Sequence, residues 1–179
     1  MGLVAVLAAC SADNVHLQAE YNRSTYDFLN FTTYHSERDT KVVIHGNPFA
    51  MEPAAFAQSV TGAMQGAHFG RRTNFTTTPG ATAEPNMMVV MAFDADVGVY
   101  ELCRGRPVRS HAPGDHLTLT AAWCFDGRED STVYARVGRP ANIDDPRFRA
   151  LVRQTVLNLF PPHKRREFRD DNDRERRHK

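Results

Sequence analysis

A ten-residue polar segment is the best candidate for a binding site in this sequence. Residues 71–80 place two guanidinium groups, an amide and four threonine hydroxyls around one aromatic ring. Such a set can make the hydrogen bonds that a sugar or an anionic group requires. A second loop would contribute if both loops leave the same end of a sheet. The predicted ligand-binding residues are His45, Asn47, Arg71, Arg72, Asn74 and Thr77. A polar edge strand followed by a turn is the alternative interpretation.

Catalytic and metal-binding motifs are scarce. The sequence contains no Gly-x-Ser-x-Gly, no phosphate-binding glycine-rich loop ending in Lys-Ser/Thr and no His-Glu-x-x-His. The eight histidines are scattered, so a metal site could form only if a hairpin brought His35, Asp39 and His45 together. We therefore expect no enzymatic activity, no cofactor and no metal. A hydrolytic site assembled from distant residues is the remaining alternative.

Two cysteines have surroundings that suit a disulfide. Cys103 and Cys124 both lie in segments that are predicted as strands, and two glycines and two prolines lie between them. Neighbouring antiparallel strands would bring the sulfurs together, and closing a loop of about 20 residues stabilises a fold by roughly 3 kcal/mol. Neither cysteine has another Cys or a His two to four residues away, which disfavours zinc. Two reduced core thiols are the alternative.

The first ten residues resemble the end of a bacterial lipoprotein signal peptide. Residues 3–9 are entirely apolar, and Leu7-Ala-Ala-Cys10 resembles the lipobox, in which small side chains precede the cysteine that is acylated. Cys10 would then become the first residue of the mature protein and hold it at a membrane. The usual positive start is missing, because the first basic residue is Arg23. Either a basic segment precedes Met1, or the match is accidental and a buried strand ends in an inert cysteine.

The residue after Cys10 bears on the destination of the protein. In the Gram-negative sorting rule that this resemblance implies, Asp at that position favours retention at the inner membrane. The residue here is Ser11. We therefore expect a lipid-anchored protein of the cell envelope that faces the periplasm, with the outer membrane favoured. An oxidising compartment in turn favours the disulfide between Cys103 and Cys124 over free thiols.

Composition limits the class of protein. A chain of 179 residues and 20.1 kDa fits one compact domain, and 41% hydrophobic with 24% charged residues is ordinary for a globular protein. A formal net charge of +1 argues against nucleic acid as a partner. Residues 163–179 are rich in both charges, which indicates a disordered tail, with contact to anionic lipid headgroups or an acidic partner as the alternative.

Hydrophobic periodicity predicts an α+β fold, with a mostly antiparallel sheet of four to six strands and two helices packed on one face. The helices are expected from Pro53 and from Pro146, the second ending before Pro161-Pro162. Strands are expected at 40–45, 86–93, 97–103, 116–125 and 131–137, with a short one in the 71–80 segment. The expected divisions are a signal-peptide remnant (1–10), a polar tether with an edge strand around 26–34 (11–38), one α+β domain (39–162) and the charged tail (163–179).

Four motifs, together with the Cys10 pattern, carry a resemblance to a family. They are Tyr26-Asp-Phe28, Met87 to Phe93, Asp126-Gly127 and Phe160-Pro-Pro162. Their order resembles a set of uncharacterised bacterial envelope lipoproteins that are built as small α+β domains, and the resemblance covers roughly two-thirds of the chain. The turn at 45–49, the threonine-rich loop and the extra cysteines depart from that pattern. The resemblance implies an envelope address and supplies no activity.

From these observations we expect a non-enzymatic, membrane-anchored periplasmic lipoprotein that acts as a structural or protein-interaction module of the cell envelope. Its expected partners are the membrane, through the lipid anchor, and an envelope protein. The alternative function is a small-ligand binding protein that holds a glycan or an anionic metabolite with the 71–80 loop. The sequence predicts no oligomeric state.

Overall fold

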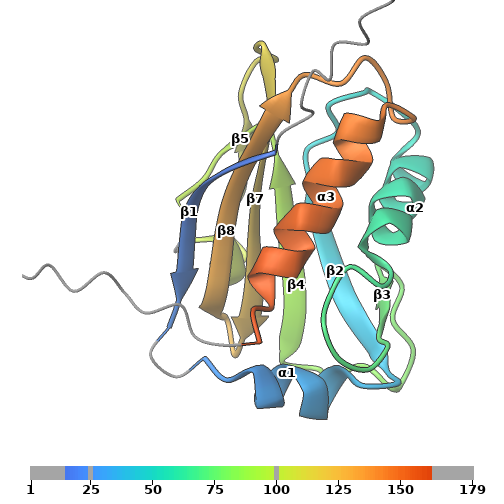
Figure 1. Cartoon of the computed structure of the whole chain (residues 1–179), viewed down its shortest axis with the longest axis vertical. Helices are drawn as coiled ribbons and strands as arrows, with labels where there is room; N and C mark the ends of the chain where they lie inside the picture. The colour runs from blue at the N-terminus through green and yellow to red at the C-terminus, as the bar shows by residue number, and fades with distance from the viewer. Residues whose placement is uncertain (1–14, 24–25, 99–100, 163–179) are drawn as a thin grey trace, which may run out of the picture.

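A computed structural model of the chain describes residues 15–23, 26–98 and 101–162. A six-stranded sheet with the order β1-β8-β7-β4-β2-β3 forms its centre (Figure 1). The strands of this sheet are β1 (His16–Asn22), β2 (Asp39–His45), β3 (Asn74–Thr76), β4 (Met87–Phe93), β7 (His116–Phe125) and β8 (Arg128–Gly138). A separate pair joins β5 (Ala95–Asp96) to β6 (Arg109–Ser110). The helices are α1 (Phe28–His35), α2 (Pro53–Met64), α3 (Pro146–Leu159) and the short 3-10 helix η1 (Leu102–Arg104).

The α+β class is confirmed, but the expectation of a mostly antiparallel sheet with two helices is wrong. The sheet is mixed: β2 runs parallel to both β3 and β4, whereas β4, β7, β8 and β1 follow one another antiparallel. There are three α-helices among the described residues. The parallel half has a simple cause. The chain leaves β2, crosses over through α2 and returns to the same sheet, and a helical crossover brings the next strand back in the same direction.

Helices α2 and α3 pack on one face of the sheet, as Figure 1 shows, and bury the larger of two hydrophobic clusters there. Alternate residues of the central strands point to this face, including Met91 of β4 and Leu119 of β7, and the apolar stripe of α3 covers them. The opposite face carries a smaller cluster of six buried residues around η1. Among the described helices, none is both long enough and apolar enough to pass through a membrane.

The expected edge strand around 26–34 is wrong, because these residues form α1. Asp27 caps this helix by accepting a hydrogen bond from the Leu29 backbone N–H at 2.9 Å. Phe31 and His35, one helical turn apart, are buried, and the ring of Phe31 stacks on that of Phe160 with centroids 3.9 Å apart. Helical spacing thus lets the aromatic side chains close the end of the sheet. The edge strand lies earlier in the chain, as β1.

The expected strand at 97–103 is also wrong. Only Ala95 and Asp96 pair as β5, and Cys103 lies in η1. Asp94 adopts a positive φ of 44° directly after β4, so the chain turns away from the main sheet there. The segment around Cys103 therefore packs against the face of the sheet and does not extend it.

Candidate functional site

Two hollows open at the end of the sheet where β2 and β4 begin and β7 ends. We call the first the α1 pocket. It has a volume of about 290 Å³ and is lined by Arg23, Asn30, Tyr34, Met87, Trp123, Phe125, Arg128, Glu129 and Asp130. We call the second the β3 pocket. It has a volume of about 300 Å³ and is lined by Glu37, Arg38, Asp39, Gln65, Arg72, Thr73, Asn74 and Thr82.

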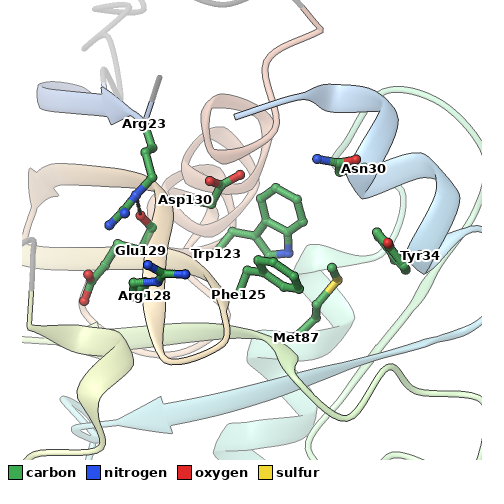
Figure 2. A pocket seen from close by; sticks show the side chains of 9 residues that line it. All are labelled: Arg23, Asn30, Tyr34, Met87, Trp123, Phe125, Arg128, Glu129 and Asp130. Carbon is green, nitrogen blue, oxygen red and sulfur yellow. Dashed lines mark hydrogen bonds between the residues drawn. The ribbon is translucent and has the colours of Figure 1, made fainter. Parts of the chain in front are cut away.

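Aromatic and thioether side chains form the apolar part of the α1 pocket. Trp123 and Met87 are buried, whereas Phe125 and Tyr34 are 41% and 37% exposed. Figure 2 shows Met87, Trp123 and Phe125 in the centre, with Tyr34 and Asn30 of α1 to one side and the charged residues to the other. The pocket is therefore amphipathic, with rings on one side and charges on the other.

The charged wall of the α1 pocket presents cations to solvent and keeps its acids inside. Arg128 is exposed at the start of β8, and no described residue forms a hydrogen bond or ion pair with its side chain. Glu129 and Asp130 are buried. The carboxylate of Glu129 accepts a hydrogen bond from the Cys103 backbone N–H at 3.0 Å, and burial together with the charge of Asp130 raises the pKa of Tyr26.

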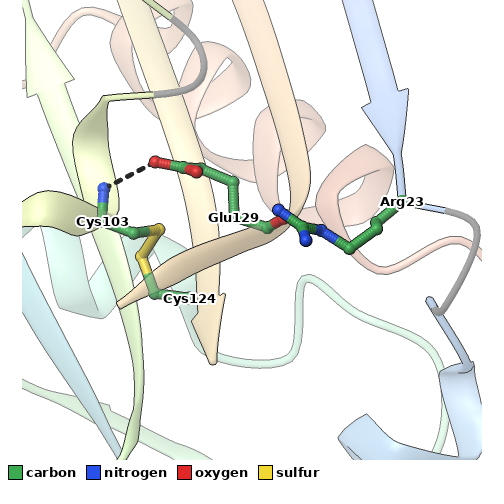
Figure 3. The surroundings of a disulfide bond; sticks show 4 residues. All are labelled: Arg23, Cys103, Cys124 and Glu129. Carbon is green, nitrogen blue, oxygen red and sulfur yellow. Dashed lines mark hydrogen bonds between the residues drawn. A yellow bond between two sulfur atoms is a disulfide. The ribbon is translucent and has the colours of Figure 1, made fainter. Parts of the chain in front are cut away.

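The predicted disulfide between Cys103 and Cys124 is confirmed, and it supports this charged wall. The two Cα atoms lie 5.5 Å apart, and the bond joins η1 to the end of β7. Figure 3 shows the bond beside Glu129, whose backbone carbonyl accepts a hydrogen bond from Nε of Arg23 at 3.0 Å. The disulfide does not join two neighbouring strands, as the sequence had suggested; it fastens a loop to the back of the sheet.

A buried chain of hydrogen bonds holds the indole of Trp123 at the α1 pocket. Nε1 of Trp123 donates to Nε2 of His35 at 3.2 Å, which leaves the ring proton on Nδ1 to donate to Oγ1 of Thr40 at 2.8 Å. The hydroxyl of Thr40 lies 2.6 Å from that of Thr73, which donates to the backbone carbonyl of Arg38 at 2.9 Å. Burial, with smaller contributions from His68 and Arg38, lowers the pKa of His35 to about 4. His35 is therefore neutral at pH 7.

The β3 pocket contains part of the predicted ligand-binding set. Arg72 and Asn74 line it, whereas Arg71 and Thr77 are exposed outside its lining. The amide of Asn74 donates to Asp39 at 2.7 Å, and the same carboxylate accepts from the Gly80 backbone N–H at 2.7 Å. These bonds, first the one from Gly80 and then the one from Asn74, lower the pKa of Asp39. Asn74 thus also holds the 71–80 loop in place.

His45 and Asn47 lie at the opposite end of the sheet, so the expectation that the two loops converge is wrong. Asn74 pairs with Asp39 at the start of β2, whereas His45 is the last residue of that strand, about 20 Å further along at 3.3 Å per residue. Because β2 and β3 are parallel, the loop after β2 and the loop before β3 leave opposite ends. The amide of Asn47 instead donates to the Met51 carbonyl at 2.8 Å.

The alternative metal group of His35, Asp39 and His45 does not assemble. His35 is buried in the hydrogen-bond chain to Trp123, and Asp39 and His45 lie at opposite ends of β2. Within the described parts of the chain, no three or more His, Cys, Asp or Glu side chains are placed to hold a metal ion. The proposed acylation site, Cys10, and the charged tail at 163–179 lie outside the described residues.

The α1 pocket is hard to predict from sequence, because its walls come from four separate segments of the chain. One signal was present in the sequence. Trp123 and Phe125 alternate with Cys124 at the end of an apolar strand, and Arg128 follows directly after the turn. Alternation places Trp123 and Phe125 on the same face of β7, within its last three residues. The facing wall of the pocket is α1, a segment for which an edge strand had been expected.

No protein-family model, no curated protein and no solved structure gives a significant match to the chain.

Proposed function

We propose that this chain is a non-enzymatic, membrane-anchored interaction module of a bacterial cell envelope, facing the periplasm. The observation that carries the proposal is the disulfide between Cys103 and Cys124, both of which are buried. Structural disulfides form and persist in oxidising compartments and are rare in a reducing cytosol. The Leu7-Ala-Ala-Cys10 pattern supplies the anchor, with the outer membrane favoured by Ser11.

The position of β1 agrees with an anchor at Cys10. His16 opens β1 and pairs with Arg136 near the end of β8, which is the end of the sheet opposite to the α1 pocket. Five residues separate Cys10 from His16, so the six steps of chain between them reach at most about 22 Å. An acylated Cys10 would therefore keep the far end of the sheet near the lipid and direct both pockets away from it.

Exposed apolar side chains at the pocket end favour an interaction role. Leu29 is 67% exposed on α1, and Tyr34 and Phe125 stand at the α1 pocket. Large rings that remain exposed beside a hollow with a charged rim are typical of binding surfaces. We assign the α1 pocket as the site through which this module contacts its envelope partner.

Metabolic labelling tests the anchor and its compartment. Cells that express the full chain are fed labelled palmitate, and Cys10→Ser is compared with the unchanged protein. We expect label and membrane association only in the chain that keeps Cys10. Alkylation of thiols before and after reduction should reveal one disulfide in the same sample. Equal labelling of the two proteins, or free thiols at Cys103 and Cys124, would contradict the proposal.

A second candidate function is binding of a glycan or an anionic metabolite in the β3 pocket. Arg38, Arg72, Gln65 and Asn74 line one hollow there, which is a suitable set for hydroxyl or anionic groups. A glycan and metabolite screen should then yield a ligand whose binding weakens in Arg72→Ala. Arg71→Ala is the matched control, because Arg71 lies outside the lining. Equal loss in both variants, or no ligand, would exclude this candidate.

A further inference from the structure

We propose that the α1 pocket recognises an aromatic ring that carries a carboxylate close by. This inference rests on the proposed function, since it takes the α1 pocket as the binding site, and it adds the chemical class of the ligand. The class follows from three properties of the pocket: exposed rings around a small hollow, a cation at its rim that has no partner among the described residues, and walls that are fixed before any ligand arrives.

The size and apolar lining of the hollow suit one ring. A volume of about 290 Å³ lies at the small end of the range for ligand sites. Phe125 and Tyr34 expose about two-fifths of their surface at this hollow, and the thioether of Met87 lies beneath. Offset or edge-to-face contacts between rings, and contacts between sulfur and a ring, are favourable beyond the area that they bury. An aromatic ring would therefore gain more here than an aliphatic chain of the same volume.

The charges at the rim favour an anion. Arg128 is exposed, and no described residue forms a hydrogen bond or ion pair with its guanidinium. The two acids of the lining do not cancel it at the surface. Glu129 is 3% exposed and accepts a hydrogen bond from Cys103 on the opposite face of the sheet. Asp130 is 8% exposed and already has a partner. A carboxylate fits the planar donor set of Arg128.

The walls are already in place, so binding needs little reorganisation. The hydrogen bond from Trp123 to His35 fixes the indole, and the hydrogen bond from Arg23 to the Glu129 carbonyl fixes the charged wall. The disulfide holds the loop behind that wall. Because the pocket is ordered before a ligand binds, binding loses less free energy to the ordering of side chains.

Two sources could supply this chemistry: a free aromatic carboxylic acid, or an aromatic residue at the carboxyl terminus of a peptide. The probes are N-acetyl-phenylalanine, its uncharged amide and the tripeptide Gly-Gly-Phe with a free carboxylate. Binding is measured by calorimetry and by the fluorescence of Trp123, which is the only tryptophan in the chain. We expect the acid to bind about tenfold more tightly than the amide, because a charge-assisted hydrogen bond contributes roughly that factor.

Variants identify the groups that make the difference. Arg128→Gln should abolish the preference for the acid over the amide, and Phe125→Ala should weaken both ligands alike. Arg109→Gln is the matched control. Arg109 is an exposed arginine on β6, which pairs with β5 just beyond the end of β4 that is opposite to the α1 pocket. Circular dichroism confirms that each variant is folded. Tighter binding of the tripeptide than of the acid identifies a peptide terminus as the source, and the reverse identifies a small acid.

Equal binding of acid and amide to the unchanged protein, a preference that survives Arg128→Gln, or no saturable binding of any probe would overturn the inference. None of these results bears on acylation of Cys10 or on the disulfide. Failure of the ligand class is therefore distinguishable from failure of the proposed function.

Discussion

Stability should fall sharply between pH 7 and pH 5 because His35 is buried in its neutral form. In the folded chain its pKa is lowered from 6.5 to about 4, so the unfolded chain binds a proton in a pH range where the folded chain does not. A lowered pKa of a base means that stability is fully present above about pH 6.5 and is lost as the pH falls toward 4. At 1.36 kcal/mol per pKa unit the full loss is about 3 kcal/mol, of which about 2 kcal/mol is reached at pH 5.

Urea denaturation at pH 7.5 and pH 5.0, followed by circular dichroism, measures this difference. His35→Gln removes the titrating group but keeps an acceptor for the indole N–H and a donor for Thr40. We expect this variant to lose about 1 kcal/mol at pH 7.5, through poorer hydrogen-bond geometry, and to lose about 2 kcal/mol less than the unchanged chain between the two pH values. His116→Gln, at an exposed position, is the control. An unchanged pH dependence in His35→Gln would refute the assignment of the effect to this histidine.

Two further predictions concern the covalent and steric constraints of the fold. Replacing Cys103 and Cys124 together by alanine should lower the free energy of unfolding by about 3 kcal/mol. A reducing agent should lower the free energy of unfolding of the unchanged chain by the same amount and should not affect the variant. Insensitivity of the unchanged chain to reduction would contradict this prediction. Gly46→Ala should lower the free energy of unfolding by about 3 kcal/mol or more, because its Cβ would lie 2.3 Å from the carbonyl oxygen of Phe93. Gly66 also has a positive φ but has open space around it, so Gly66→Ala should lower the free energy of unfolding by about 1 kcal/mol. Thermal melts that rank the two glycine variants equally would show that the clash is relieved without cost.

The elements with strong local signals were predicted well from the sequence. Prolines mark the first residue of α2 at Pro53 and of α3 at Pro146, and β7 spans exactly the predicted residues 116–125. These segments carry their own evidence, because a periodic apolar pattern and a terminating residue lie in the same short window.

The errors arose where tertiary contacts decide. Helix α1 contains two threonines and an asparagine, which have low helix propensity, and its stability comes from Phe31 packing on Phe160, far away in the sequence. The spacing of Phe28, Phe31 and His35 after the cap Asp27 was the signal that could have identified it. The parallel pairing of β2 with β4 was also predictable, since a strand, a helix and a further strand in succession indicate a parallel crossover.

The candidate site was predictable only in part for the same reason. The polar composition of segment 71–80 is visible in the sequence, and two of its predicted residues, Arg72 and Asn74, line the β3 pocket. The α1 pocket has no such local signature, because Arg23, Asn30, Met87 and Arg128 meet only after the sheet and α1 have formed. A wrong assignment of one short helix was therefore enough to hide this pocket.

The pairing of the first strand with the last has a consequence for the order of folding. In the sheet, β1 pairs with β8, with His16 opposite Arg136, so this edge cannot form until nearly the whole chain is available. The hairpin of β7 and β8, by contrast, joins neighbours in sequence and can assemble early. In a polypeptide that is synthesised from its N-terminus, β1 would thus be made first and remain unpaired until β8 has been added.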